Sequence, residues 1–113
     1  MATLTTQTIT RAGVDPSLTA AAGGGDSFTP GDDVFLHINN GGGSSITVTI
    51  AGQGTILPNM DVPDVVVSVT NGQDRFIGPF PHVYFADPTD GLCDVTYSGV
   101  TSVTVGAFRL AKP

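Results

Sequence analysis

Apolar and polar residues alternate along much of the chain after residue 33, with the period of two that is typical of β-strands. The clearest case is residues 46–51, ITVTIA, where three apolar side chains share one face and two threonines lie on the other. Similar patterns predict strands at residues 34–39, 65–70, 74–78, 83–86, 93–97 and 102–110. Because half-buried antiparallel strands alternate in this way, we expect an all-β fold of about seven to eight short strands.

Turn signals separate the predicted strands and suggest how they are connected. NNGGG at residues 39–43 predicts a hairpin between the strands on either side of it. Asn71-Gly72 predicts a second hairpin, because Asn-Gly favours two-residue hairpin turns. Short strands and turns at these intervals predict one β-sandwich of antiparallel strands, jelly-roll-like or Greek-key, that spans residues 1–113 as a single domain.

The N-terminal residues 1–11 have two alternative interpretations. Threonines occupy both faces of the segment, which holds too little apolar surface to anchor itself. It is therefore either the edge strand of the sheet or an extended arm that adds its backbone to the sheet of a neighbouring subunit. The candidate partner-binding residues of such an arm are Leu4, Thr6, Thr8, Ile9 and Arg11.

Residues 12–33 form a long connection that contains glycine and proline. Asp15 precedes Pro16, and this pair predicts the start of one helical turn over residues 17–22. Further along, the aromatic residues Phe76, Phe80, Tyr84 and Phe85 are interpreted as core and strand-end packing.

Composition and charge limit the partners that the protein is expected to have. The 113 residues include 15 Thr, 13 Val and 6 Ile, and ten Asp oppose four Lys and Arg, for a net charge of −6. This negative field repels phosphates, so no nucleic-acid partner is expected. A signal peptide and an apolar run long enough for a membrane span are both missing, which predicts a soluble protein made in the cytosol without a membrane partner. Only 12% of residues are charged, which suits permanent contact with other subunits.

No motif indicates catalysis, a cofactor or a transition metal. His37 and His82 lie in different elements, and Cys93 has no partner at metal-ligand spacing, so we expect a buried thiol. No serine lies in a Gly-x-Ser-x-Gly elbow. The sequence therefore predicts neither an enzyme nor a cofactor.

One acidic turn is a weak candidate for calcium. Asp87, Asp90 and Asp94 lie close together, but they lack the alternating oxygen ligands and the terminal Glu of an EF-hand. Asp before Pro and Asp before Gly are also ordinary turn residues, and both interpretations stay open.

Four stretches carry a family resemblance: FLHINNGGG at residues 35–43, ITVTI at 46–50, RFIGPFP at 75–81 and VTYSGVTSVTVGAFRL at 95–110. With them the chain resembles small minor capsid or head decoration proteins of tailed bacteriophages that infect actinobacteria. The resemblance covers most of the chain, and its motifs are strands and turns.

The resemblance implies a non-enzymatic virion protein on the capsid exterior. Such a protein binds between subunits of the major capsid protein, as a homotrimer, and braces the shell against the pressure of the packaged DNA. Two alternatives remain: a tail or head-to-tail connector protein, and a module that binds a glycan or host surface. For the second, the candidate regions are the loops at residues 23–33 and 52–63, with Tyr84 and Tyr97 as candidate contacts.

Overall fold

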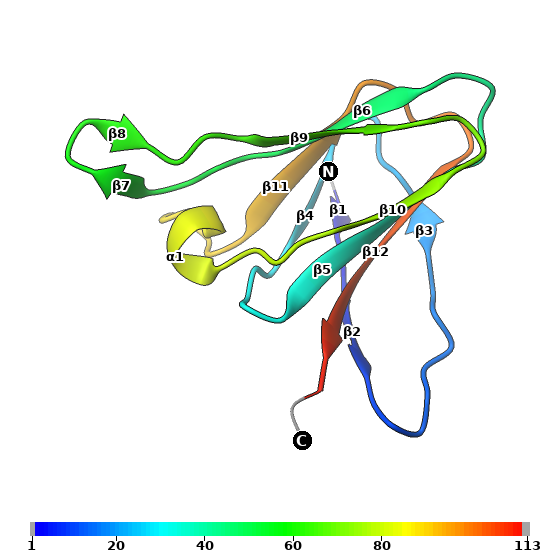
Figure 1. The fold of residues 1–113 in the computed structure, drawn as a ribbon, viewed down its shortest axis with the longest axis horizontal. Coiled ribbons are helices and arrows are strands. Elements are labelled where there is room, and N and C mark those ends of the chain that lie inside the picture. Colours follow the sequence, from blue (N-terminus) through cyan, green and yellow to red (C-terminus); the bar gives the residue numbers. More distant parts are fainter. Residues whose placement is uncertain (1, 112–113) are drawn as a thin grey trace.

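Two sheets pack face to face in the computed structural model, which describes residues 2–111 (Figure 1). The first, sheet A, has the strand order β1 (Ala2–Thr3), β4 (Asp26–Phe28), β11 (Cys93–Tyr97), β6 (Ile46–Ile50) and β9 (Val65–Val69). The second, sheet B, has the order β10 (Asp74–Ile77), β5 (Val34–Asn40), β12 (Val103–Leu110) and β2 (Thr6–Ile9), and β3 (Thr19–Ala20) also pairs with β12. The predicted all-β sandwich is confirmed.

Two smaller elements lie beside the sheets. A hairpin of β7 (Thr55–Leu57) and β8 (Met60–Asp61) projects from one end of the molecule in Figure 1. The short helix α1 (His82–Phe85) lies near the same end. The strand segments outnumber the seven to eight expected because several of them have only two or three residues.

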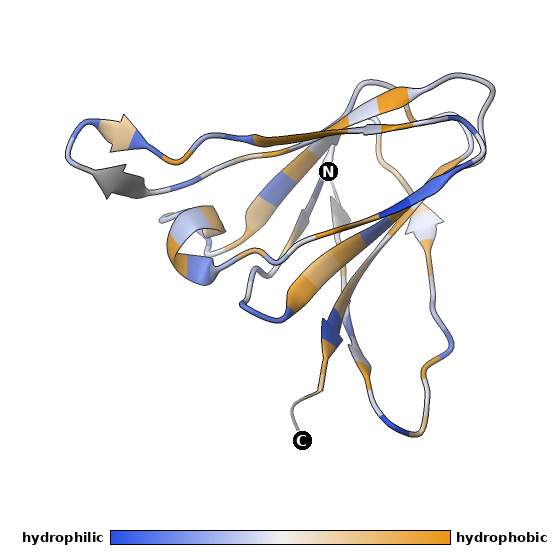
Figure 2. Cartoon of the chain, viewed as in Figure 1, coloured by the Kyte–Doolittle hydropathy of each residue, from blue (hydrophilic) through white to orange (hydrophobic). Residues whose placement is uncertain are grey.

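The core lies between the sheets and follows the predicted alternation. In β6 the residues Ile46, Val48 and Ile50 are buried, while the two threonines between them are partly exposed. Figure 2 shows hydrophobic residues along β5, β9 and β11 as well. An aromatic cluster closes one end of the core, where the ring of Phe80 lies 5.2 Å from that of Phe28 and 5.3 Å from that of Phe85.

Both predicted hairpins are wrong, because each turn carries the chain from one sheet to the other. Residues 41–45 lead from β5 in sheet B to β6 in sheet A, and residues 70–73 lead from β9 back to β10. Asn40 forms hydrogen bonds to both connections between the sheets and to the end of β9. Its buried side-chain amide donates to the carbonyls of Ser44 and Val69 at 2.9 and 3.0 Å, and its backbone carbonyl accepts the Gly72 N–H at 2.7 Å.

The strand predicted at residues 83–86 is also wrong, since α1 occupies this place. Pro79 and Pro81 flank Phe80, and neither proline has an N–H group for a strand ladder. The helix instead places Phe85 against Phe80 in the core, where Phe85 is 7% exposed.

The predicted helical turn at residues 17–22 is replaced by strand β3. Thr19 and Ala20 pair with Val105 and Thr104 of β12, and the Ala21 N–H donates to the Val103 carbonyl at 2.9 Å. Pairing with a long, buried strand therefore overrides the local signals for a helix.

The N-terminal segment forms edge strands within its own sandwich. β1 runs parallel to β4 in sheet A, and β2 runs parallel to β12 in sheet B, so the expectation of purely antiparallel pairing fails at these two places. Between the two strands, Leu4 is 8% exposed and its N–H donates to the Ser27 carbonyl at 2.7 Å. Of the two predictions for this segment, the edge strand agrees with the structure.

Candidate functional site

The five candidate partner-binding residues do not share one environment. Leu4 is buried in the core. Thr6 and Ile9 in β2 are partly buried, whereas Thr8 and Arg11 are exposed. Arg109 in β12 donates from its Nε to the Thr8 hydroxyl at 3.3 Å, so Thr8 already has a partner within the chain. Only part of the segment is therefore accessible to another subunit.

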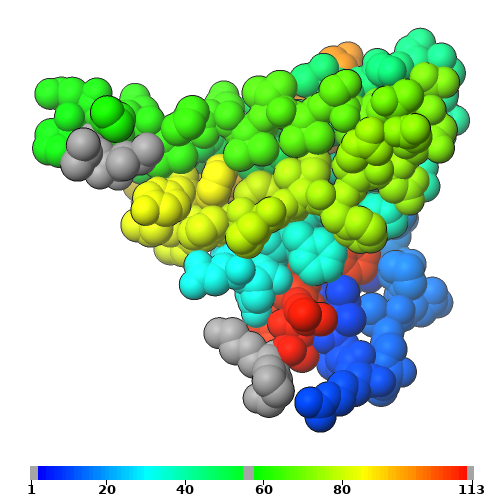
Figure 3. All heavy atoms as spheres, viewed as in Figure 1, coloured from blue at the N-terminus to red at the C-terminus, as the bar shows by residue number. Residues whose placement is uncertain are grey.

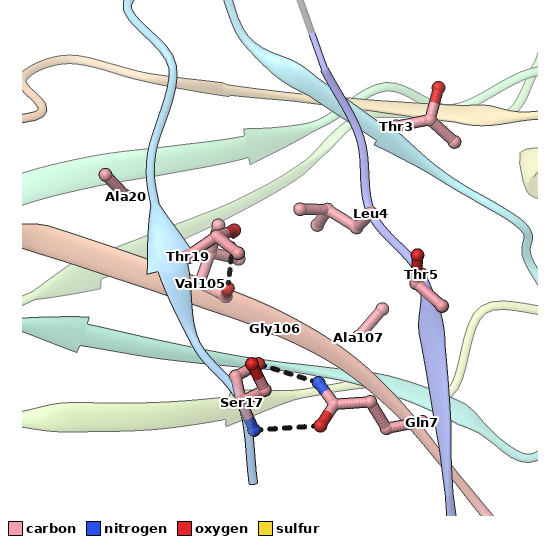
Figure 4. A pocket seen from close by; sticks show the side chains of 10 residues that line it. All are labelled: Thr3, Leu4, Thr5, Gln7, Ser17, Thr19, Ala20, Val105, Gly106 and Ala107. Carbon is pink, nitrogen blue, oxygen red and sulfur yellow. Dashed lines mark hydrogen bonds between the residues drawn. The ribbon is translucent and has the colours of Figure 1, made fainter.

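A cleft of about 440 Å³ lies beside this segment, where β2 and β3 share one edge of β12 (Figure 4). The Gln7 side chain spans it and makes two hydrogen bonds to the backbone of Ser17, at 2.7 and 2.8 Å. The Thr19 hydroxyl donates to the Val105 carbonyl at 3.4 Å. No charged side chain lines the cleft. These contacts indicate a structural role, in which they hold β2 and β3 together on the edge of β12.

The acidic turn uses its carboxylates to stabilise the loop. Asp87 accepts the Thr89 N–H at 2.8 Å, and Asp90 accepts the Leu92 N–H at 2.9 Å. Partial burial, followed by the charges of Asp90 and Asp87, raises the pKa of Asp94. Within residues 2–111 no three His, Cys, Asp or Glu side chains are grouped so that they would hold a metal ion. The contacts agree with the turn interpretation of these residues.

A buried polar pair was missed by the sequence analysis. Asp26 is 1% exposed, and its Oδ2 accepts the Tyr97 hydroxyl at 2.7 Å and the Ala22 N–H at 3.2 Å. Burial, followed by the hydrogen bond to Asp26, raises the pKa of Tyr97. Each of these polar groups has a partner, which indicates a structural role between β4 and β11.

Cys93 is fully buried, and burial followed by the charge of Asp94 raises its pKa from 9.0 to about 12. We expect iodoacetamide to modify the thiol slowly at pH 9 in the folded protein and rapidly in urea, because the thiolate is the reactive form. Above pH 9 the unfolded chain loses a proton that the folded chain keeps, so this group lowers stability as the pH rises. Mass spectrometry measures the labelling, and equally fast labelling in the folded and unfolded states would contradict the buried position.

The most distinctive surface is the outer side of sheet B, where four aromatic side chains form what we call the aromatic face: Phe35, His37, Phe76 and Phe108. The alternation in β5 explains two of them. Because Val34, Leu36 and Ile38 point into the core, Phe35 and His37 point outward.

The rings of the aromatic face contact one another across three strands. Phe76 in β10 stacks on His37 with ring centres 4.5 Å apart and an interplanar angle of 21°. Phe35 stacks on Phe108 in β12 at 5.9 Å. The Nε2 of His37 lies 3.0 Å from Asp74 Oδ2, which also fixes the imidazole ring. Residues far apart in the sequence thus form one cluster of contacting rings, of which Phe76 is the most exposed.

A glycine lets this surface lie close to the sheet. A Cβ atom at Gly106 would lie 2.7 Å from the Leu18 Cδ2 and 2.9 Å from the Phe108 ring. Leu18 and Phe108 can therefore cover the backbone of β12 only because residue 106 has no side chain. Phe108 is 3% exposed as a result, although it lies outside the main core.

Phe76, by contrast, is 69% exposed. The predictions of core packing for Phe80 and Phe85 are confirmed, but those for Phe76 and for Tyr84, which is 41% exposed, are wrong. For Phe76 the reason is the alternation in β10, because Ile77 occupies the inward position and Phe76 must face the other side. A hollow of about 570 Å³ lies on the aromatic face beside Phe76.

No protein-family model, curated protein or solved structure matches the chain. Within the described residues, no helix has the length and apolar character needed to cross a membrane.

Proposed function

We propose that the protein is a non-enzymatic structural protein of a bacteriophage particle, which decorates the capsid exterior as a homotrimer and binds between subunits of the major capsid protein. The observation that carries this proposal is the aromatic face. A mostly exposed phenylalanine that stacks on further rings presents apolar surface to water, and contiguous surface of this kind marks an interaction site.

Charge also supports a structural role. Few charges need to be desolvated when a surface with only 12% charged residues is covered by other subunits. The net charge of −6 opposes contact with packaged DNA and suits a position outside the shell.

The test is co-sedimentation with capsids assembled without this protein from the major capsid protein of the same phage. We expect saturable binding at a fixed ratio of the two proteins. Phe76→Ser is expected to weaken binding by about tenfold, since exposed aromatic anchors contribute much of the binding energy of an interface.

The matched control is Val66→Ser, because Val66 is 62% exposed on β9, in the other sheet. This variant is expected to bind as the unchanged protein does. A chain that stays monomeric and does not bind capsids would overturn the proposal.

The alternatives make different predictions. A connector or tail protein would use the same aromatic face but form rings of six or more copies, which light scattering detects. A glycan-binding module that depends on Tyr97 is disfavoured, because the Tyr97 hydroxyl donates to buried Asp26.

A further inference from the structure

We infer that the hollow on the aromatic face binds a short segment of the partner protein in which apolar side chains adjoin a lysine or arginine. The inference rests on the proposed function and names the chemistry of the partner. It follows from the apolar lining of the hollow, from a second hollow beside it, and from the charges at the far end of the second hollow.

The first hollow is lined almost entirely by apolar side chains. Phe35 and Phe108 belong to the two central strands, and Phe76 belongs to the edge strand β10. Val14 and Pro16 reach it from the connection that follows β2, and Val14 is itself 38% exposed. His37 is the one polar side chain in the lining, and its Nε2 already contacts Asp74. Such a lining favours apolar side chains over a polar ligand.

A second hollow of about 400 Å³ lies beside the first, and Phe35 and Phe76 line both. It extends past Pro79 to Leu110, which is 59% exposed. We call the two hollows together the aromatic trough. Figure 3 shows atoms of β5 next to the end of β12 on one face of the molecule.

Carboxylates stand at the far end of the aromatic trough. Asp32 and Asp33 line the second hollow. Asp33 lies 3.9 Å from Arg109, whereas exposed Asp32 has no ion pair among the described residues. A cationic side chain of the partner would therefore meet a carboxylate that has no ion pair with any residue that the structure describes.

The same charges disfavour other occupants. A second copy of the chain, with its ten Asp against four Lys and Arg, is a poor match for the Asp32 end, so the proposed homotrimer would associate through a surface other than the aromatic trough. Nucleic acids and anionic membranes present phosphates to the Asp32 end. A segment with apolar residues and one positive charge complements both parts of the aromatic trough.

The test is selection from a display library of random 12-residue peptides on the full-length protein. We expect the enriched peptides to share an apolar run with a Lys or Arg at one end of it. Synthetic copies of the enriched peptides should bind Phe76→Ser about tenfold more weakly and Asp32→Asn about threefold more weakly. Val66→Ser and Asp61→Asn, which change exposed residues outside the aromatic trough, should bind as the unchanged protein does.

In the peptide selection, three results would overturn the inference: no enrichment, enriched peptides without a basic residue, or peptide binding that survives Phe76→Ser. A dimer in solution that Phe76→Ser dissociates would identify a second copy as the occupant and would also overturn it. A different result overturns the proposed function, namely the absence of capsid binding. Capsid binding that persists in Phe76→Ser would leave the decoration role in place and reject the aromatic trough as its site.

Discussion

Deletion of residues 2–9 is expected to lower the free energy of unfolding by about 4 kcal/mol, because the deletion removes buried Leu4 and the pairing of two strands. β1 pairs with β4 and β2 pairs with β12, so each sheet loses an edge strand. The loss is a large part of the roughly 5–15 kcal/mol by which small domains are stable. A free arm would not have this effect.

Urea denaturation followed by circular dichroism measures the loss. Leu4→Ala should account for about 3 kcal/mol of it, as is usual when a buried leucine is truncated. Thr5→Ala is the matched control, since Thr5 is an exposed residue in the same segment, and it should change stability by less than about 0.5 kcal/mol. A truncated chain as stable as the full chain would show that the segment is not part of the sandwich.

Asp26→Ala is expected to cost about 3 kcal/mol, because it removes a buried side chain and leaves the partly buried Tyr97 hydroxyl and Ala22 N–H without their partner. Each unsatisfied group costs about 1–3 kcal/mol, and the truncated side chain also leaves a cavity.

The double variant Asp26→Ala with Tyr97→Phe tests this explanation. Removal of the Tyr97 hydroxyl should restore part of the stability, because only the Ala22 N–H is then left without its partner. Asp61→Ala, at an exposed position in β8, is the control and should have little effect. Strictly additive losses in the double variant would contradict the direct hydrogen bond.

The inward faces of the strands were predictable because alternation is a local property. In β6 and β5 every second residue is buried, as the sequence predicts. The sheet to which each strand belongs was not predictable in this way. β2 pairs with β12 across almost the whole chain, and nothing near Thr6 or Ile9 indicates that partner.

The turns illustrate the same limit. Asn-Gly at residues 71–72 is a strong local signal for a hairpin, yet the strands on either side of it belong to different sheets. The turn fits there because Gly72 has a φ of 77° and its N–H donates to Asn40. The position of the turn was thus predicted, while the predicted hairpin was wrong because the pairing of the strands depended on contacts far along the chain.

The candidate site was only partly predictable. Alternation places Phe35 and His37 on the face opposite Val34 and Leu36, but it does not tell whether that face is covered. Phe108 is buried where it lies over Gly106 together with Leu18 from the long connection, whereas Phe76 is 69% exposed. The path of the connection at residues 12–33 therefore helps to decide which aromatic residue stays exposed. The sequence predicted a helical turn in this connection, so that path was not foreseen.

Hydroxyl-radical footprinting of the protein, free and bound to capsids, tests the central claim most directly, because it reports the exposure of individual side chains. In the free protein Phe76 and Leu110 should be oxidised readily, as should Met60, which is 49% exposed in the β7–β8 hairpin. On capsids, our account predicts that Phe76 and Leu110 become protected and Met60 does not. Unchanged oxidation of Phe76 on fully decorated capsids would contradict the proposal that the aromatic face is the contact surface.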